Sequence, residues 1–195
     1  MTAPTNQALP CVFFDRDGIV NVGPSDEEYY VLTPDRLLII PEFLECLKIV
    51  AEKGYVSVIV TNQKCVHLDK LSVDGLEAIH VVLRTAIDAA GAQLLAIYSA
   101  VHGDGHPDSK PAPGMFLSAA QDHNIALEQS WMIGDSPRDM DAGHAAGCPR
   151  NILVSSTKQS PRANDQLASM KELPEFLRAN LPKLGPTAIY HRPER

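Results

Sequence analysis

The sequence predicts an α/β fold in which a central parallel sheet is covered by helices on both faces. Short apolar segments typical of buried strands alternate along the chain with longer segments in which apolar residues recur at helical spacing. Polar residues of distinct types directly follow several of the apolar segments. In a sheet of this class the strand ends form the usual functional site. We therefore expect the chemistry of this chain at the carboxyl edge of the sheet.

The length and composition are those of one ordinary globular domain. The chain has 195 residues, of which 45% are hydrophobic, and this is enough for a full core. Its net charge of −7 argues against a nucleic-acid backbone as the main partner. No run of about 18 apolar residues occurs, and residues 1–10 lack the apolar core of a signal peptide. We expect a cytoplasmic protein with no membrane partner, either a monomer or a weak homo-oligomer.

Four cysteines are spread along the chain, namely Cys11, Cys46, Cys65 and Cys148. None of them forms a Cys-x-x-Cys pair, so their spacing favours neither a zinc site nor a secreted disulfide framework. We expect buried, reduced thiols.

The first half of the chain supplies three strands of the predicted sheet. Residues 11–15 form the first of them, because Val12, Phe13 and Phe14 make the continuous apolar run of a strand buried on both faces. Pro41 opens a helix that ends before Gly54, since proline suits a helix start and glycine a helix end. The other elements of this half are a strand at 55–60, a helix at 73–90 and a strand at 94–98.

The second half of the chain continues the alternation. A loop at 100–112 leads to a helix that starts at Pro113 and ends near His123. The elements that follow are a strand at 130–133, a helix at 137–146, a strand at 150–154, a polar linker at 155–163 and a final helix at about 164–180, with a tail behind it. We predict one domain over residues 1–195, with its core at about 10–156.

Two acids stand directly after the first strand. Asp15 and Asp17 end an apolar segment, where buried like charges would repel each other and lack water. A divalent cation is the simplest compensation, and Mg²⁺ prefers oxygen ligands. The sequence therefore predicts a magnesium site at the end of the first strand.

Three further segments bring polar groups to the same edge. Thr61 and Asn62 follow the strand at 55–60, Asp135 follows the strand at 130–133, and Lys110 precedes a helix start. Phosphoryl transfer needs a nucleophile, an acid for the leaving oxygen and positive charge around the phosphoryl oxygens. These segments together contain the residue types for that reaction.

Each of these residues has a possible role in phosphoryl transfer. Asp15 can be the nucleophile and form an aspartyl-phosphate. Asp17, on the same face two residues on, can protonate the leaving alcohol and later take a proton from the attacking water. Asp135 can complete the Mg²⁺ site, and Thr61 can hold phosphate oxygens. Lys110 can bind phosphate and keep the nucleophile ionised.

Taken together and in this order, the motifs resemble those of the haloacid dehalogenase-type (HAD) phosphohydrolases. The matching segments are DRDG at 15–18, TNQ at 61–63, KPAPGM at 110–115 and GDSPRDMDAG at 134–143. The resemblance implies a Rossmann-like three-layer sandwich that hydrolyses a phosphoric monoester through an aspartyl-phosphate. It implies catalytic roles for Asp15, Asp17, Thr61 and Lys110. It also implies that Mg²⁺ is held by the side chains of Asp15 and Asp135 and the backbone carbonyl of Asp17, with Asp139 supporting the metal loop.

Within this family, the chain most resembles the branch that holds heptose 1,7-bisphosphate phosphatase and histidinol-phosphate phosphatase. The runs FFDRDG, TNQ and GDSPRDM carry this resemblance. It implies a small phosphorylated metabolite as substrate, with a sugar bisphosphate such as heptose 1,7-bisphosphate first, and histidinol phosphate or another phosphomonoester as the alternative. A phosphoryl transferase and a phospholigand-binding module without turnover stay open as other functions.

We expect no cap domain over the site. The intervals from Asp15 to Thr61 and from Thr61 to Lys110 are filled by the loop, helix and strand predicted for each. Substrate selection must then come from the rim loops 19–30, 62–70 and 100–110. The predicted substrate-binding residues are Thr61, Asn62, Gln63, Lys64, Ser109 and Lys110.

The loop before Lys110 lacks the cysteines that hold zinc in many members of this branch. It reads AVHGDGHPDSK, and its possible ligands are His102, Asp104, His106 and Asp108. Mixed hard ligands in a glycine-rich loop are usually solvated. We therefore expect Mg²⁺ as the cofactor and no zinc.

Overall fold

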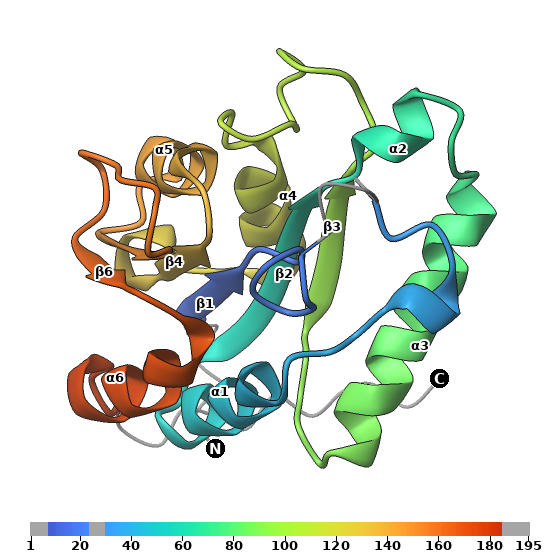
Figure 1. The fold of residues 1–195 in the computed structure, drawn as a ribbon. Coiled ribbons are helices and arrows are strands. Elements are labelled where there is room, and N and C mark those ends of the chain that lie inside the picture. Colours follow the sequence, from blue (N-terminus) through green and yellow to red (C-terminus); the bar gives the residue numbers. More distant parts are fainter. Residues whose placement is uncertain (1–7, 24–29, 185–195) are drawn as a thin grey trace, which may run out of the picture.

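A parallel sheet of six strands forms the centre of the computed structural model, which describes residues 8–23 and 30–184 (Figure 1). The strands are β1 (Cys11–Phe14), β2 (Val56–Asn62), β3 (Ala96–Ala100), β4 (Trp131–Gly134), β5 (Arg150–Val154) and β6 (Asp165–Leu167). Their order is β3-β2-β1-β4-β5-β6, and every neighbouring pair runs parallel. The predicted α/β fold is confirmed, with the first strand of the chain inside the sheet.

Helices cover both faces of the sheet (Figure 1). The α-helices are α1 (Pro41–Glu52), α2 (Lys64–His67), α3 (Val73–Ala89), α4 (Gly114–His123), α5 (Pro137–Ala146) and α6 (Leu173–Asn180). Short 3₁₀-helices lie at Pro34–Arg36, Leu127–Gln129 and Met170–Glu172. This arrangement is the predicted three-layer sandwich.

Strand β1 separates two apolar cores. Its residues are fully buried, and alternate side chains point to opposite faces. Phe14 packs edge-on against Phe43 of α1 with ring centroids 5.4 Å apart, in the core that also holds α3 and α6. Phe13 packs against Phe116 of α4 at 4.7 Å, in the core that holds α4 and α5. This two-sided burial fixes the point at which the chain leaves β1 and reaches Asp15.

The start of α5 is fixed by a capping box. The Ser136 backbone N–H donates to Asp139 Oδ2 at 3.0 Å, so a backbone N–H that has no partner within the helix is satisfied. The Ser136 hydroxyl donates to the same oxygen at 2.9 Å. A Cβ atom on Gly134 would lie 2.4 Å from the Cβ atom of Asp139. The glycine at the end of β4 therefore allows the Asp139 side chain to lie against the strand.

The prediction of one helix over 164–180 is wrong. Residues 165–167 form β6, which pairs with β5, and α6 begins only at Leu173. The sequence DQL has no apolar run, so its strand depends on the exposed edge of β5 and not on a local pattern. Similarly, β2 extends to Asn62 because Thr61 and Asn62 pair with β3. The third strand lies at 96–100 and not at 94–98.

Loops and the short helix α2 stand at the carboxyl edge of the described part of the sheet (Figure 1). No separate cap is present among residues 8–23 and 30–184. The predicted tail beyond residue 184 and part of the rim loop 19–30 lie outside the described residues. The four cysteines are buried and free, as predicted. Among the helices described, none combines the length and apolar character needed to cross a membrane.

Candidate active site

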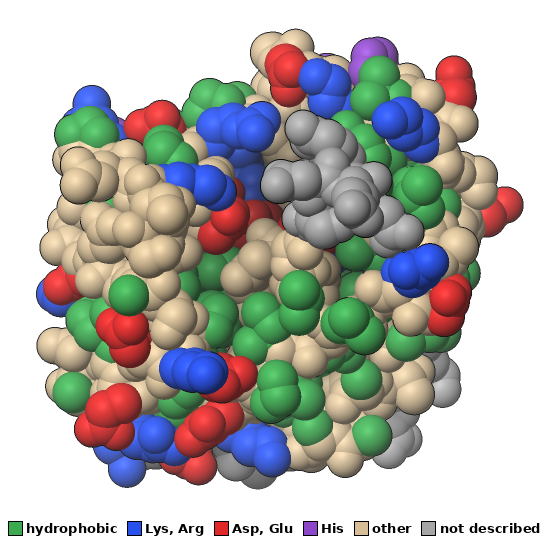
Figure 2. Space-filling view, viewed as in Figure 1, with side chains coloured by type: hydrophobic (Ala, Val, Ile, Leu, Met, Phe, Trp, Pro, Cys, Tyr) green, Lys and Arg blue, Asp and Glu red, His purple; other side chains and the backbone are tan. Residues whose placement is uncertain are grey.

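A cavity of about 640 Å³ opens at the carboxyl edge of the sheet. Its lining comes from the ends of β1 and β2, the loop before α4, the start of α5 and the loop between β5 and β6. Figure 2 shows the hollow, with acidic side chains inside it and Lys and Arg side chains around it. The lining includes Asp15, Asp17, Thr61, Asn62, Lys64, Asp104, Ser109, Lys110, Asp135, Arg138, Asp139 and Lys158.

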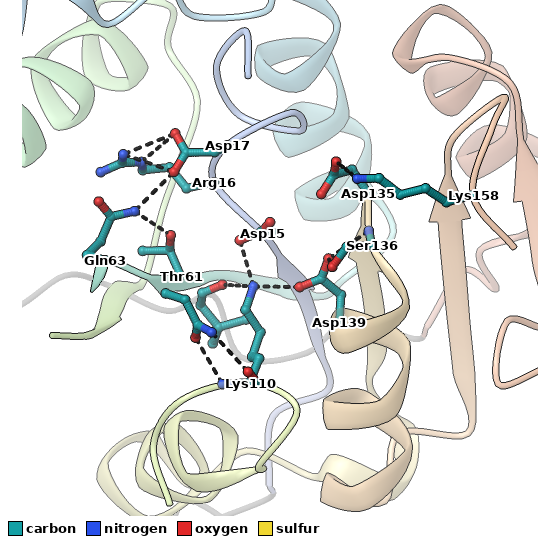
Figure 3. A network of polar contacts seen from close by, with 12 residues as sticks. Asp15, Arg16, Asp17, Thr61, Gln63, Lys110, Asp135, Ser136, Asp139 and Lys158 are labelled. Atoms are coloured by element: carbon teal, nitrogen blue, oxygen red, sulfur yellow. Dashed lines mark hydrogen bonds and ion pairs between the residues drawn. The ribbon is translucent and has the colours of Figure 1, made fainter. Parts of the chain in front are cut away.

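Lys110 connects the acidic groups at the bottom of this cavity (Figure 3). Its Nζ lies 2.6 Å from Asp15 Oδ1 and 2.6 Å from Asp139 Oδ1, and it donates to the Val60 carbonyl at 2.9 Å. Lys110 and Asp139 are almost fully buried, with 4% and 1% of their surface exposed. A buried ammonium needs such partners because it has lost its water. The structure thus brings together Asp15, Lys110 and Asp139 from three separate segments.

Asn62 holds the backbone of Lys110 in place. Its Nδ2 donates to the Lys110 carbonyl, and its Oδ1 accepts from the Lys110 N–H, both at 2.9 Å. The pair of bonds uses both ends of the amide, so Asn62 positions Lys110 relative to the end of β2. Asn62 thus lines the cavity, where it is predicted to bind substrate, and also positions Lys110.

Charges at the bottom of the cavity shift two pKa values. Burial, and next the Asp139 carboxylate, raise the pKa of Asp15 to about 7, against the opposing effect of Lys110. Burial lowers the pKa of Lys110, but the carboxylates of Asp139 and Asp15 outweigh it and raise that pKa overall. The carboxylates of Asp15 and Asp139 thus share the one ammonium of Lys110, and these three groups together carry an excess of negative charge when both acids are ionised.

The acidic groups suit a hard divalent cation. Carboxylate oxygens of Asp15, Asp135 and Asp139 lie within 4.8 Å of one another, and oxygen is the ligand type that Mg²⁺ prefers. Both Asp139 oxygens are already engaged, by Lys110 and Ser136. This favours Asp15 and Asp135 as the side chains that contact a cation and Asp139 as their support. Lys158 donates to Asp135 Oδ2 at 2.8 Å, so a positive group already faces this carboxylate.

Asp17 is turned away from this cluster (Figure 3). Arg16 Nη2 lies 3.0 Å from both of its oxygens. Asn21 Nδ2 donates to Oδ1 at 3.0 Å and Gln63 Nε2 donates to Oδ2 at 3.1 Å. Arg16 is only 1% exposed, and a buried guanidinium without a carboxylate partner would be strongly destabilising. Asp17 is therefore both part of the cavity lining and the counter-ion of a buried arginine.

Gln63 does not line the cavity, which corrects its predicted place among the substrate contacts. It is 2% exposed, and its Nε2 donates to Thr61 Oγ1 at 2.8 Å as well as to Asp17. The buried Gln63 side chain thus fixes Thr61 and Asp17 relative to each other. We assign Gln63 to positioning and not to substrate contact.

Arg16, Arg138 and Lys158 are site residues that the sequence analysis does not single out. Arg16 lies inside the DRDG motif, and strand alternation places position 16 on the same side as the buried Phe14. An arginine at a position predicted to be buried, between two acids, indicates an ion pair with one of them. Lys158 lies in a polar linker with no spacing signal. Its loop is held by Gln166, whose Nε2 donates to the carbonyls of Ser155 and Lys158 at 2.7 and 2.9 Å.

Comparisons with known proteins show the family of this chain. A HAD-hydrolase-like family model matches residues 108–184. D-glycero-beta-D-manno-heptose-1,7-bisphosphate 7-phosphatase of Vibrio cholerae is 33% identical over 184 residues, which are 87% of this chain and 97% of that protein. The same enzyme of Helicobacter pylori strain 26695 is 31% identical over 178 residues, or 89% of this chain and 99% of that protein.

A solved structure supports the same relationship. D,D-heptose 1,7-bisphosphate phosphatase from B. bronchiseptica, complexed with magnesium and phosphate, superposes with a TM-score of 0.76 at 28% identity. The match covers 87% of this chain and 98% of that one. The chain therefore belongs to the HAD-like hydrolases and is a phosphatase of that family.

Proposed function

We propose that this protein hydrolyses one phosphate ester of a small sugar bisphosphate, with Asp15 as the nucleophile. The observation that carries the proposal is the placement of Lys110 between Asp15 and Asp139 at the bottom of an open cavity, next to Asp135. An aspartate held by a buried ammonium beside a cation site has the surroundings that an aspartyl-phosphate needs.

In the first step, an Asp15 oxygen attacks phosphorus and the bond between phosphorus and the sugar oxygen breaks. For this step Asp17 must be protonated and must turn from Arg16 towards the substrate; it then gives its proton to the departing oxygen, so the sugar leaves as an alcohol. Lys110 and the Thr61 hydroxyl face the phosphoryl oxygens, whose charge must be balanced throughout the transfer.

In the second step, water attacks the phosphorus of the aspartyl-phosphate. Asp17 takes a proton from this water, the bond between phosphorus and Asp15 breaks, and inorganic phosphate leaves. Asp15 is then a carboxylate again. The side chains of Asp15 and Asp135 and the Asp17 carbonyl would hold Mg²⁺, which would supply positive charge to the phosphoryl group.

Support for a sugar bisphosphate comes from the relatives and from the cavity. The relatives are named for heptose 1,7-bisphosphate, and the cavity has Lys64, Arg138 and Lys158 among its lining. Four buried cysteines without a disulfide support a reducing compartment, and we place the protein in the cytoplasm. We propose that it acts as a monomer or weak homo-oligomer on small molecules, without a nucleic-acid or membrane partner.

The proposed substrate can be tested with a panel of phosphate esters at saturating Mg²⁺. We expect kcat/KM for D-glycero-D-manno-heptose 1,7-bisphosphate to exceed that for a sugar monophosphate, fructose 1,6-bisphosphate and histidinol phosphate by at least about tenfold. Phosphate release is measured at matched enzyme concentration. A preference for histidinol phosphate would assign the protein to the other activity of this branch, and no release from any ester would contradict a phosphatase.

The position of Gln63 predicts an effect that depends on the leaving group. Gln63→Met removes the donors to Asp17 and Thr61 but keeps the side-chain volume. We expect kcat for a sugar phosphate to fall about tenfold more than kcat for p-nitrophenyl phosphate, because only a poor leaving group needs a well-placed acid.

The matched control is Cys65→Ala. The Cys65 thiol contacts Gln63 Oε1 at 3.7 Å, so this change leaves the two Nε2 bonds in place and should not alter the ratio. Equal losses on both esters in Gln63→Met would show that Gln63 does not act through Asp17.

A further inference from the structure

We propose that Lys64 and Arg138 form a second anion-binding site at the mouth of the cavity, which takes the non-reacting phosphate of the bisphosphate, and that Asp104 occupies it until substrate binds. We call Lys64 and Arg138 the distal anion site. The inference rests on the proposed function, since it assigns the second phosphate of that substrate class.

The two cations lie close in sequence to residues of the predicted site. Lys64 is the first residue of α2, three positions after Thr61, and Arg138 lies in the first turn of α5, next to Asp139. Both line the cavity whose bottom holds Asp15 and Lys110. A ligand with one phosphate on Lys110 can therefore extend within the same cavity towards Lys64 and Arg138.

In this structure the carboxylate of Asp104 already contacts the distal anion site. Asp104, in the loop before α4, accepts from Lys64 Nζ at 2.5 Å through its Oδ2. Bonding to Lys64 lowers the pKa of Asp104, and the charges of Arg138 and His67 lower it further. One exposed carboxylate thus lies in the field of several positive groups, as a bound anion would.

This resident carboxylate is easy to displace. The Lys64 and Asp104 side chains are 39% and 68% exposed, and exposed ion pairs contribute little to stability. A phosphate carries more charge than a carboxylate and offers three oxygens. No ion pair of Arg138 occurs among residues 8–23 and 30–184, so its planar guanidinium has donors for two phosphate oxygens.

The arrangement gives selectivity as well as binding. A monophosphate fills only the bottom of the cavity and leaves Asp104 on Lys64. A bisphosphate replaces Asp104 and gains contacts with both cations. The distal anion site therefore favours substrates with a second phosphate over those without one.

The test compares heptose 1,7-bisphosphate with heptose 7-phosphate, which share the ester to be cleaved. We expect Lys64→Met and Arg138→Met each to lower the bisphosphate-to-monophosphate ratio of kcat/KM by about tenfold, mainly through KM for the bisphosphate. Asp104→Asn should raise the ratio by about two- to fivefold, because it removes the competing anion. Lys48→Met, on the exposed side of α1, changes the net charge equally and should leave the ratio as it is.

A binding measurement separates this inference from the proposed function. In an Asp15→Asn background, calorimetry with the same two sugar phosphates needs no turnover. Adding Lys64→Met should weaken bisphosphate binding about tenfold and change monophosphate binding by less than about twofold. If both ligands lose affinity equally, or neither does, the distal anion site is wrong even where phosphatase activity is present. If binding behaves as expected but no ester is hydrolysed, the site stands and the proposed function fails.

Discussion

Asp15→Asn is expected to reduce phosphate release from p-nitrophenyl phosphate by at least about 1,000-fold. A neutral amide cannot attack phosphorus, and this ester has a good leaving group, so the loss reports on the nucleophile and not on the acid. The fold should persist, because Lys110 keeps its contacts with Asp139 and with the Val60 carbonyl. Initial rates at saturating Mg²⁺, together with the thermal midpoint, check both statements.

Asp141→Asn is the matched control for that variant. Asp141 lies exposed on α5, close in sequence to Asp139 but outside the cavity lining, and its loss should leave the rate within about twofold of wild type. Substantial turnover by Asp15→Asn would remove Asp15 as nucleophile and with it the aspartyl-phosphate route.

Lys110→Met is expected to destabilise the metal-free protein by about 3–5 kcal/mol at pH 8. Without the ammonium, Asp15 and Asp139 face each other in a buried site and only protonation can relieve their repulsion. The pKa of Asp15 is already raised to about 7 in the presence of Lys110, and it should rise further in this variant. An acid whose pKa is higher in the folded than in the unfolded protein loses stability as pH rises between the two values. The destabilisation should therefore be small near pH 5 and grow through pH 7.

Urea unfolding of the metal-free proteins at pH 5 and pH 8 measures this effect. Lys158→Met is the comparison, because it removes an ammonium from the more exposed Asp135 and should cost less than about 1 kcal/mol at either pH. An equal loss of stability at both pH values in Lys110→Met would mean that the lysine acts by packing and not by balancing the two carboxylates.

Local patterns were sufficient to predict the central strand and the acids that follow it. The run Val12 to Phe14 has no polar position, so a strand buried on both faces was the only element that suited it, and Asp15 had to emerge at the strand end. In the same way, the apolar segment of β4 predicts Gly134 and Asp135 at its end. Parallel connectivity then required these ends to share one edge of the sheet, which is what the structure shows for Asp15, Lys110 and Asp135.

Features set by distant parts of the chain could not be predicted in this way. Strand β6 forms by pairing with the edge of β5, and the short segment DQL has no alternating or continuous apolar pattern that would predict a strand. Gln63 follows two polar residues that line the cavity, yet it is buried beneath them, because Asp17 and Thr61 accept both of its amide bonds. The contact of Lys158 with Asp135 likewise depends on how the β5–β6 loop approaches the end of β4.

The position of β1 within the sheet has a consequence for synthesis of the chain on the ribosome. Its two neighbours are β2 and β4, and β4 is made long after β1 has left the exit tunnel. Until then one side of a very apolar strand stays open, and Asp15 lacks the Asp139 side of its surroundings. A growing polypeptide that stops before residue 139 would thus hold half of a catalytic centre, and catalysis can begin only after residue 139 has left the exit tunnel.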